Sequence, residues 1–236
     1  MNTFIHKANT RGHANHGWLD SHHSFSFANY YDPSRVHFGM LRVLNDDVVK
    51  GGMGFGTHPH DNMEIVSIPL RGALEHKDTT GRNEVICTND VQIMSAGSGI
   101  SHSEYNASKT DPVNFLQIWV FPKLKNIPPR YEQKTVKPED RVNNLLTVVS
   151  PEKEGQGVWI NQDAWFQLGT LKKGFQTEYT IKKKGNGVYA FVLEGDVTVS
   201  GQKLNKRDGL GVSDTDTISI TADSDLEILL IEVPMN

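Results

Sequence analysis

The chain has 236 residues, with 28 acidic and 24 basic side chains and a formal net charge of -4. At roughly 150 residues per domain, this length predicts one large domain or two small ones, either of which can bury a core without disulfides. The mild negative charge disfavours a dedicated binder of nucleic acid or of anionic membranes, because such proteins need a basic face.

The cysteine count and the N-terminal sequence indicate the cellular compartment. Cys87 is the single cysteine, so no disulfide can form within the chain, and a reducing compartment is favoured. The first residues lack the apolar core of a signal peptide, and no run approaches the roughly 18 apolar residues that a membrane span needs. We therefore expect a cytoplasmic protein without direct contact to nucleic acid or membrane.

Short apolar runs predict strands along most of the chain. The runs are about 4–8 residues long, rich in Val, Ile and Phe, and separated by Gly, Asn and Asp. No stretch shows a long apolar stripe with the helical period. Many short, evenly spaced strands predict an all-β sandwich or barrel. In chain order the predicted strands are Met40–Leu44, Glu64–Leu70, Val85–Cys87, Val91–Met94, Asn114–Phe121, Leu145–Val149, Tyr189–Leu193, Val197–Ser200, Thr217–Thr221 and Leu226–Val233.

A weak internal repeat divides the chain into two similar units. The runs IPLRGAL (Ile68–Leu74) and FVLEGDV (Phe191–Val197) each place a glycine turn between two strands, and an aspartate-marked turn follows each of them. Prolines and charges between the units are typical of a linker. The expected boundaries are 1–125 for an N-terminal domain, 126–141 for the linker and 142–236 for a C-terminal domain.

The histidines gather in the first half of the chain, since all 10 lie at or before His102. His58 and His60 are two residues apart, so on a strand their side chains project to the same face. His102 and Glu104 repeat that spacing. If the two segments meet, three neutral nitrogens and one anionic oxygen converge, which suits a divalent transition metal with coordination positions left open. We predict one metal per chain, held by His58, His60, His102 and Glu104.

Other side chains near these segments have two interpretations each. Glu64 shares the parity of His60 but lies about 13 Å beyond it on an ideal strand, so we expect it to support a ligand rather than to be one. His22 and His23 point to opposite faces of a strand, so only one of them can line the pocket, and a surface or core role is favoured over that one. Five apolar side chains are expected either to line a pocket over the metal or, equally, to lie in the core: Phe25, Phe27, Phe38, Met40 and Phe55.

The blocks GFGTHPHDNMEIVSI (Gly54–Ile68) and QIMSAGSGISHSEYN (Gln92–Asn106) resemble the two cupin motifs in the form found in pirins. The runs HGWLDSHHSFSFANYYDP (His16–Pro33) and QIWVFP (Gln117–Pro122) extend the resemblance over nearly the whole chain. It is strongest to bacterial pirin-like proteins with quercetin 2,3-dioxygenase activity. The resemblance implies a bicupin, with two β-barrels in one chain and the family's three His and one Glu at the four positions predicted above.

The second unit is expected to be metal-free. Aligning its glycine and aspartate turns with those of the first unit puts Ile181, Lys183, Ile220 and Ala222 at the four ligand positions. None of these side chains rebuilds the metal site.

The function implied by the resemblance is a dioxygenase that cleaves a flavonol such as quercetin with O₂ and releases carbon monoxide. Glu104 would be the catalytic base that takes the proton of the flavonol 3-hydroxyl. Iron is the expected metal, although Ni, Co, Cu, Mn or Zn would also suit these ligands. The alternative is a non-enzymatic, redox-sensing protein whose metal shapes a surface for a transcription factor or a metabolic enzyme.

Overall fold

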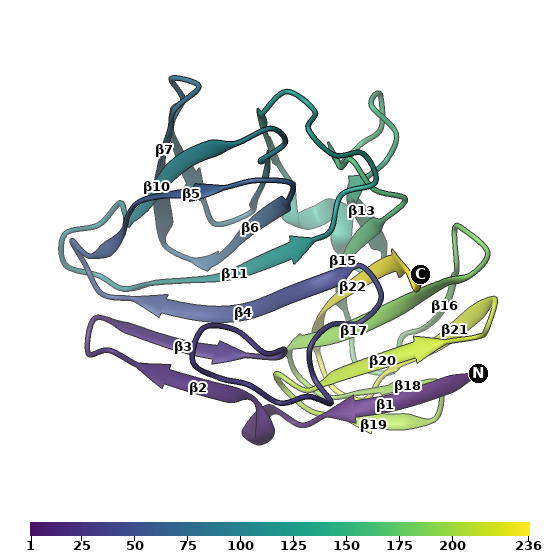
Figure 1. Cartoon of the computed structure of the whole chain (residues 1–236). Helices are drawn as coiled ribbons and strands as arrows, with labels where there is room; N and C mark the ends of the chain where they lie inside the picture. The colour runs from purple at the N-terminus through teal and green to yellow at the C-terminus, as the bar shows by residue number, and fades with distance from the viewer.

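The computed structural model describes residues 1–236, and its regular secondary structure is almost entirely β-strand (Figure 1). Its only helices are two short 3-10 turns, η1 (Ala8–Thr10) and η2 (Pro138–Arg141), and no helix is long and apolar enough to cross a membrane. The strands form two sheets of seven and two sheets of four. The predicted all-β, two-barrel architecture is confirmed.

The N-terminal barrel has one seven-stranded and one four-stranded sheet, both antiparallel. Their spatial orders are β12-β9-β6-β11-β4-β3-β2 and β5-β10-β7-β8. The strands are β2 (Gly12–Asn15), β3 (Leu19–His23), β4 (Leu41–Val49), β5 (Gly54–His60), β6 (Glu64–Arg71), β7 (Ala73–Asp78), β8 (Asn83–Cys87), β9 (Asp90–Ser95), β10 (Ile100–Asn106), β11 (Val113–Val120) and β12 (Arg130–Thr135).

The C-terminal barrel repeats this plan except that β14 pairs parallel with β13, and its spatial orders are β1-β20-β17-β22-β15-β13-β14 and β16-β21-β18-β19. A core of 16 buried apolar side chains fills the space between its sheets. The strands are β1 (Asn2–His6), β13 (Leu145–Ser150), β14 (Val158–Trp159), β15 (Trp165–Leu171), β16 (Gln176–Thr180), β17 (Asn186–Glu194), β18 (Val197–Val199), β19 (Gln202–Leu204), β20 (Gly209–Ser213), β21 (Thr217–Ala222) and β22 (Leu226–Pro234).

The largest core lies between the two barrels, where the two seven-stranded sheets contribute most of 25 buried apolar side chains. Strand β17 shows how the sequence specifies this arrangement. Its alternate residues Val188, Ala190 and Val192 enter the core of the C-terminal barrel, whereas Tyr189 and Phe191 enter the core between the barrels. Because successive side chains point to opposite faces, a strand buried on both faces reads as a continuous apolar run.

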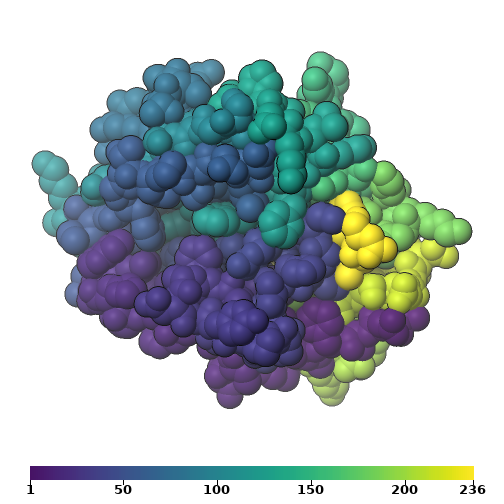
Figure 2. Space-filling model, in the orientation of Figure 1, coloured from purple at the N-terminus to yellow at the C-terminus, as the bar shows by residue number.

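Two strands cross the boundaries expected from the sequence. The first strand, β1, pairs with β20 of the C-terminal barrel, and the purple N-terminal residues lie against yellow-green residues of that barrel in Figure 2. Strand β12 falls within the predicted linker 126–141 and pairs with β9 of the N-terminal barrel. Its sequence RYEQKT is mixed and only half-buried, as suits an edge strand, and therefore lacks the apolar alternation that marks strands.

Candidate metal centre

Two antiparallel strands, β5 and β10, position the four predicted ligands. His102 lies opposite His58 in the register of these strands, and a bulge follows between His102 and Glu104. Gly54 permits the close approach of the strands, because a Cβ there would lie 2.5 Å from the Cα of Tyr105. The local sequence thus brings the two segments together, as the spacing argument requires.

The three imidazoles converge on one point. Donor atoms of His58, His60 and His102 all lie within 4.8 Å of one another. The ring centroid of His102 is 4.5 Å from that of His58 and 4.9 Å from that of His60. The Nδ1 atom of His58 is 2.8 Å from the carbonyl oxygen of Gly56, so that carbonyl can hold the Nδ1–H tautomer and leave Nε2 free as a ligand.

Burial keeps these imidazoles in the form that binds metal. Desolvation, reinforced by the neighbouring His58, lowers the pKa of His102 to about 2 and that of His60 to about 4. Both rings are therefore neutral at pH 7 and need not release a proton on binding a cation. Both ring nitrogens of His102 are also buried without a hydrogen-bond partner. Such unsatisfied groups are rare in proteins, and a metal ion would satisfy one of them.

Glu104 lies beside His102 but belongs to a second, overlapping group. Donor atoms of His76, His102 and Glu104 lie within 4.8 Å of one another, whereas Glu104 is outside the 4.8 Å group of the three imidazoles above. Its Oε1 accepts a hydrogen bond from the Ser67 hydroxyl at 3.1 Å, and its Oε2 accepts one from the Gln117 amide at 2.7 Å. Burial raises the pKa of Glu104 to about 7, so this carboxylate can accept a proton near neutral pH.

His76 is a neighbour of this site that the sequence analysis did not single out. It lies opposite Glu104 in the pairing of β7 with β10, and its ring centroid is 5.2 Å from that of His102. Its Nε2 is 3.0 Å from Oδ2 of Asp78. The signal was present, because His76 and Asp78 are two residues apart, as His58 and His60 are.

The donor set fits a divalent transition metal. Three neutral imidazole nitrogens and one carboxylate on two adjacent strands are borderline ligands that suit iron, nickel, cobalt, copper, manganese or zinc. His102, which has partnerless nitrogens and belongs to both groups, is the centre of the set.

A pocket of about 130 Å³ opens beside His58 and Glu104 and is lined by both aromatic and polar side chains. Phe27 and Phe55 line it as predicted, and Trp119, which was not predicted, contacts Phe27 edge-on at 5.4 Å between centroids. The remaining lining residues are Ala14, His16, Leu19, Ser21, His23, Ala28, Asn45, Asp47 and Gln117.

The other predicted pocket residues lie elsewhere. Phe25 and Phe38 are buried in the core between the barrels and pack on Tyr189, and Met40 packs against the same core. They therefore contact the C-terminal barrel rather than the metal centre. Apolar character alone does not tell on which side of a sheet an aromatic side chain lies.

Glu64 also faces the C-terminal half of the chain, so the expectation that it supports a ligand is corrected. Its Oε2 accepts hydrogen bonds from the Ser95 hydroxyl at 2.8 Å and from the backbone N–H of Asn161 at 3.1 Å. The reason is topological: His60 ends β5 in the four-stranded sheet, whereas Glu64 begins β6 in the seven-stranded sheet.

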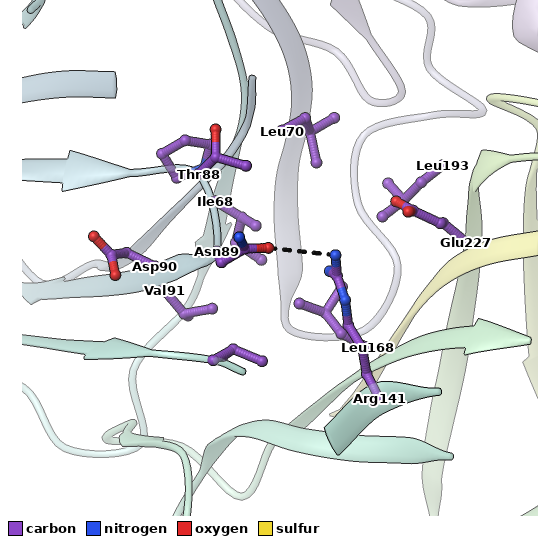
Figure 3. Close-up of a pocket in the computed structure, with 12 residues that line it drawn as sticks. Ile68, Leu70, Thr88, Asn89, Asp90, Val91, Arg141, Leu168, Leu193 and Glu227 are labelled. Carbon is purple, nitrogen blue, oxygen red and sulfur yellow. Dashed lines mark hydrogen bonds between the residues drawn. The ribbon is translucent and has the colours of Figure 1, made fainter. Parts of the chain in front are cut away.

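Neither the C-terminal barrel nor the cavity between the barrels offers a comparable centre. Ile220 and Ala222 are part of the packed apolar core of that barrel, and every His, Cys, Asp and Glu group that could hold a metal lies at or before Glu104. Figure 3 shows a pocket that residues of both barrels line, where the Arg141 guanidinium donates to the Asn89 side chain at 3.4 Å. It contains no imidazole or thiol.

Comparisons with known proteins agree with this geometry. Residues 5–120 match the family described as Pirin, and residues 147–233 match the Quercetinase C-terminal cupin domain. The chain is 47% identical to a quercetin 2,3-dioxygenase of Escherichia coli (strain K12) over 231 residues, which cover 98% of each protein. The crystal structure of the bacterial pirin YhhW from Escherichia coli in complex with nickel(II) is similar, with a TM-score of 0.93, 46% identity and 99% of each chain covered. The chain belongs to the pirin family.

Proposed function

We propose that the protein is a metal-dependent dioxygenase that cleaves a flavonol such as quercetin. The reaction adds O₂ to the flavonol, opens its heterocycle and gives a phenolic ester and carbon monoxide. The observation that carries the proposal is the pocket that meets both His58 and Glu104, because it gives a small molecule access to the metal centre and to a buried base. Relatives named quercetin 2,3-dioxygenase support the substrate class.

His58, His60, His102 and Glu104 would hold the metal, with iron proposed and nickel supported by the complex of the related YhhW. When bound, a divalent cation supplies Lewis acidity that favours ionisation of a hydroxyl placed next to it. The imidazoles would be neutral ligands, so Glu104 alone among the four would offset part of the charge of a bound cation.

Glu104 would take the proton of the flavonol 3-hydroxyl. Its carboxylate accepts hydrogen bonds from Ser67 and Gln117, and its burial raises the pKa and so favours acceptance of a proton. Phe27, Phe55 and Trp119 would orient the flat ring system and exclude water, since they are the large aromatic side chains that line the pocket.

The test is anaerobic loading of the purified full chain with Fe²⁺ or Ni²⁺, followed by quercetin and then air. We expect loss of the flavonol absorbance together with an equivalent of carbon monoxide. A flavone without the 3-hydroxyl serves as the substrate control, and Glu104→Gln keeps the side-chain shape while it removes the base. Absence of carbon monoxide, or equal consumption of the control compound, would contradict the proposal.

A further inference from the structure

The pocket has a polar wall on the side of the seven-stranded sheet. We define the β3–β4 wall as Ser21 and His23 of β3 with Asn45 and Asp47 of β4, all of which line the pocket. His23 lies opposite Asn45 and Ser21 lies opposite Asp47 in the register of the two strands. The proposed metal ligands lie on the other, four-stranded sheet, so the pocket has a metal side and a second polar side.

A hydrogen-bond chain fixes how this wall presents its atoms. The Ser21 hydroxyl donates to Oδ1 of Asp47, and the Ser21 hydroxyl oxygen is 2.8 Å from Nε2 of His23. Because Ser21 uses its hydrogen on Asp47, its oxygen accepts the hydrogen of His23 Nε2. The neutral ring then carries a lone pair on Nδ1, which becomes a hydrogen-bond acceptor.

Two acceptors on the wall have no partner. Nδ1 of His23 and Oδ1 of Asn45 are buried and make no hydrogen bond. Solvent cannot replace the missing partners, because the two residues are only 3% and 2% exposed. A buried acceptor without a partner is costly, and native proteins seldom keep one without a functional reason. Two such atoms on directly paired residues inside one pocket indicate a ligand that brings hydrogen-bond donors.

The neighbours of these acceptors indicate what carries the donors. The Phe27 ring meets the His23 ring edge-on at 5.3 Å between centroids, and Trp119 meets Phe27 in the same way. Aromatic side chains beside paired acceptors suit a flat ring that bears hydroxyl groups.

We propose that the β3–β4 wall is a recognition site for phenolic hydroxyl groups of the substrate, which His23 Nδ1 and Asn45 Oδ1 accept as hydrogen bonds. This inference rests on the proposed function, because it assigns the substrate ring remote from the metal to this wall. It makes His23 and Asn45 specificity-determining residues that select polyhydroxylated substrates over less hydroxylated ones.

The test compares anaerobic binding of three flavonols with zero, one and two hydroxyls on the pendant phenyl ring to the metal-loaded full chain. Quenching of tryptophan fluorescence reports binding, since Trp119 lies in the pocket. Two variants each change one acceptor: Asn45→Leu removes it at similar volume, and His23→Gln keeps an amide that can donate to Ser21 but has no acceptor at the position of Nδ1. Gln167→Leu is the matched control, because its amide Nε2 is also buried without a partner but lies on β15, outside this pocket.

We expect the wild type to bind the dihydroxylated flavonol about tenfold more tightly than the unhydroxylated one, as a pair of net hydrogen bonds allows. Each pocket variant should lose roughly threefold of that preference, while Gln167→Leu keeps it. Asn45→Leu should unfold at or above the wild-type temperature, because it removes an unsatisfied acceptor; a purely structural role for Asn45 predicts the opposite.

Equal affinity of the wild type for all three flavonols, or an unchanged preference in both pocket variants, would overturn this inference. If the protein shows no hydroxyl preference but still converts flavonols with release of carbon monoxide, the proposed function stands and only this inference fails. Strong hydroxyl preference without turnover would instead support the recognition site and count against the dioxygenase activity.

Discussion

Glu64→Gln should stabilise the protein at alkaline pH, because Glu64 is an acid buried between the barrels rather than a partner of the metal. The residue is fully buried, and its Oε1 has no hydrogen-bond partner. Burial raises its pKa to about 7 from an ordinary value of 4.5, which corresponds to about 3 kcal/mol. The hydrogen bonds from Ser95 and Asn161 and the charge of Arg130 oppose the rise but do not cancel it.

The direction of the stability change with pH follows from the number of protons that the native and the unfolded state bind. Between pH 4.5 and 7 the native state keeps the Glu64 proton while the unfolded state has lost it, so stability falls as the pH rises through this window. The penalty is absent below the window and complete above it. Glutamine keeps an oxygen that can accept from Ser95 and Asn161 but never ionises. The variant should therefore equal the wild type near pH 4.5 and gain up to about 3 kcal/mol at pH 8.

Urea unfolding of the full-length wild type and variant across this pH range measures the difference. Glu178→Gln is the matched control, because Glu178 lies exposed on β16 and its replacement should leave the pH dependence unchanged. A Glu64→Gln variant that is less stable than the wild type at pH 8 would refute the reasoning. It would show that the ionised carboxylate and Arg130 form a net stabilising pair.

Three further predictions follow from the placement of the other residues. Glu104→Ala should weaken metal binding at least tenfold or abolish turnover, whereas Glu64→Ala should do less; chelator competition and flavonol consumption measure both, and the reverse order would contradict the assignment. A fragment comprising residues 1–141 should be aggregated or loosely folded in size-exclusion chromatography, with weakened metal affinity, because it exposes the core between the barrels and removes the partner strand of β1; a monomeric fragment with full turnover would count against this. Phe25→Ala should cost about 3–5 kcal/mol in urea unfolding without changing flavonol affinity, whereas Phe27→Ala should weaken flavonol binding; equal effects on binding would be inconsistent with the pocket described.

The convergence of the three imidazoles could be predicted in part, because the spacing of His58 and His60 is local, whereas their meeting with His102 also needs two strands to pair. His58 and His60 share a face of any strand, and β5 and β10 are neighbours in one sheet. The polar wall was harder to predict. Asn45 and Asp47 interrupt an apolar run, so the predicted strand ended at Leu44, whereas β4 continues to Val49. Partners across the sheet stabilise that polar run, and such partners are distant in sequence.

The wrong predictions for the aromatic residues and for the edge strand have a common physical cause. Phe25 and Phe38 are as apolar as Phe27, and only the packing of one barrel on the other decides which side of the sheet each occupies. Likewise, β12 is held by backbone pairing with β9, to which side-chain composition contributes little. Spacing within a strand predicted that His58 and His60 share a face, whereas the positions of Phe25 and Glu64 depend on how the sheets are arranged and were predicted wrongly.

The most direct test of the metal centre is a crystal of the nickel-loaded full chain measured at the nickel absorption edge. The proposed ligand set predicts one strong anomalous peak per chain, about 2 Å from nitrogens of His58, His60 and His102, with Glu104 completing the set. Two other groups could hold a cation by proximity: one is His76 with His102 and Glu104, and the other is the surface group of His13, Asp20 and His22. A sole strong peak at either of these groups, with none among the three imidazoles, would contradict the assignment.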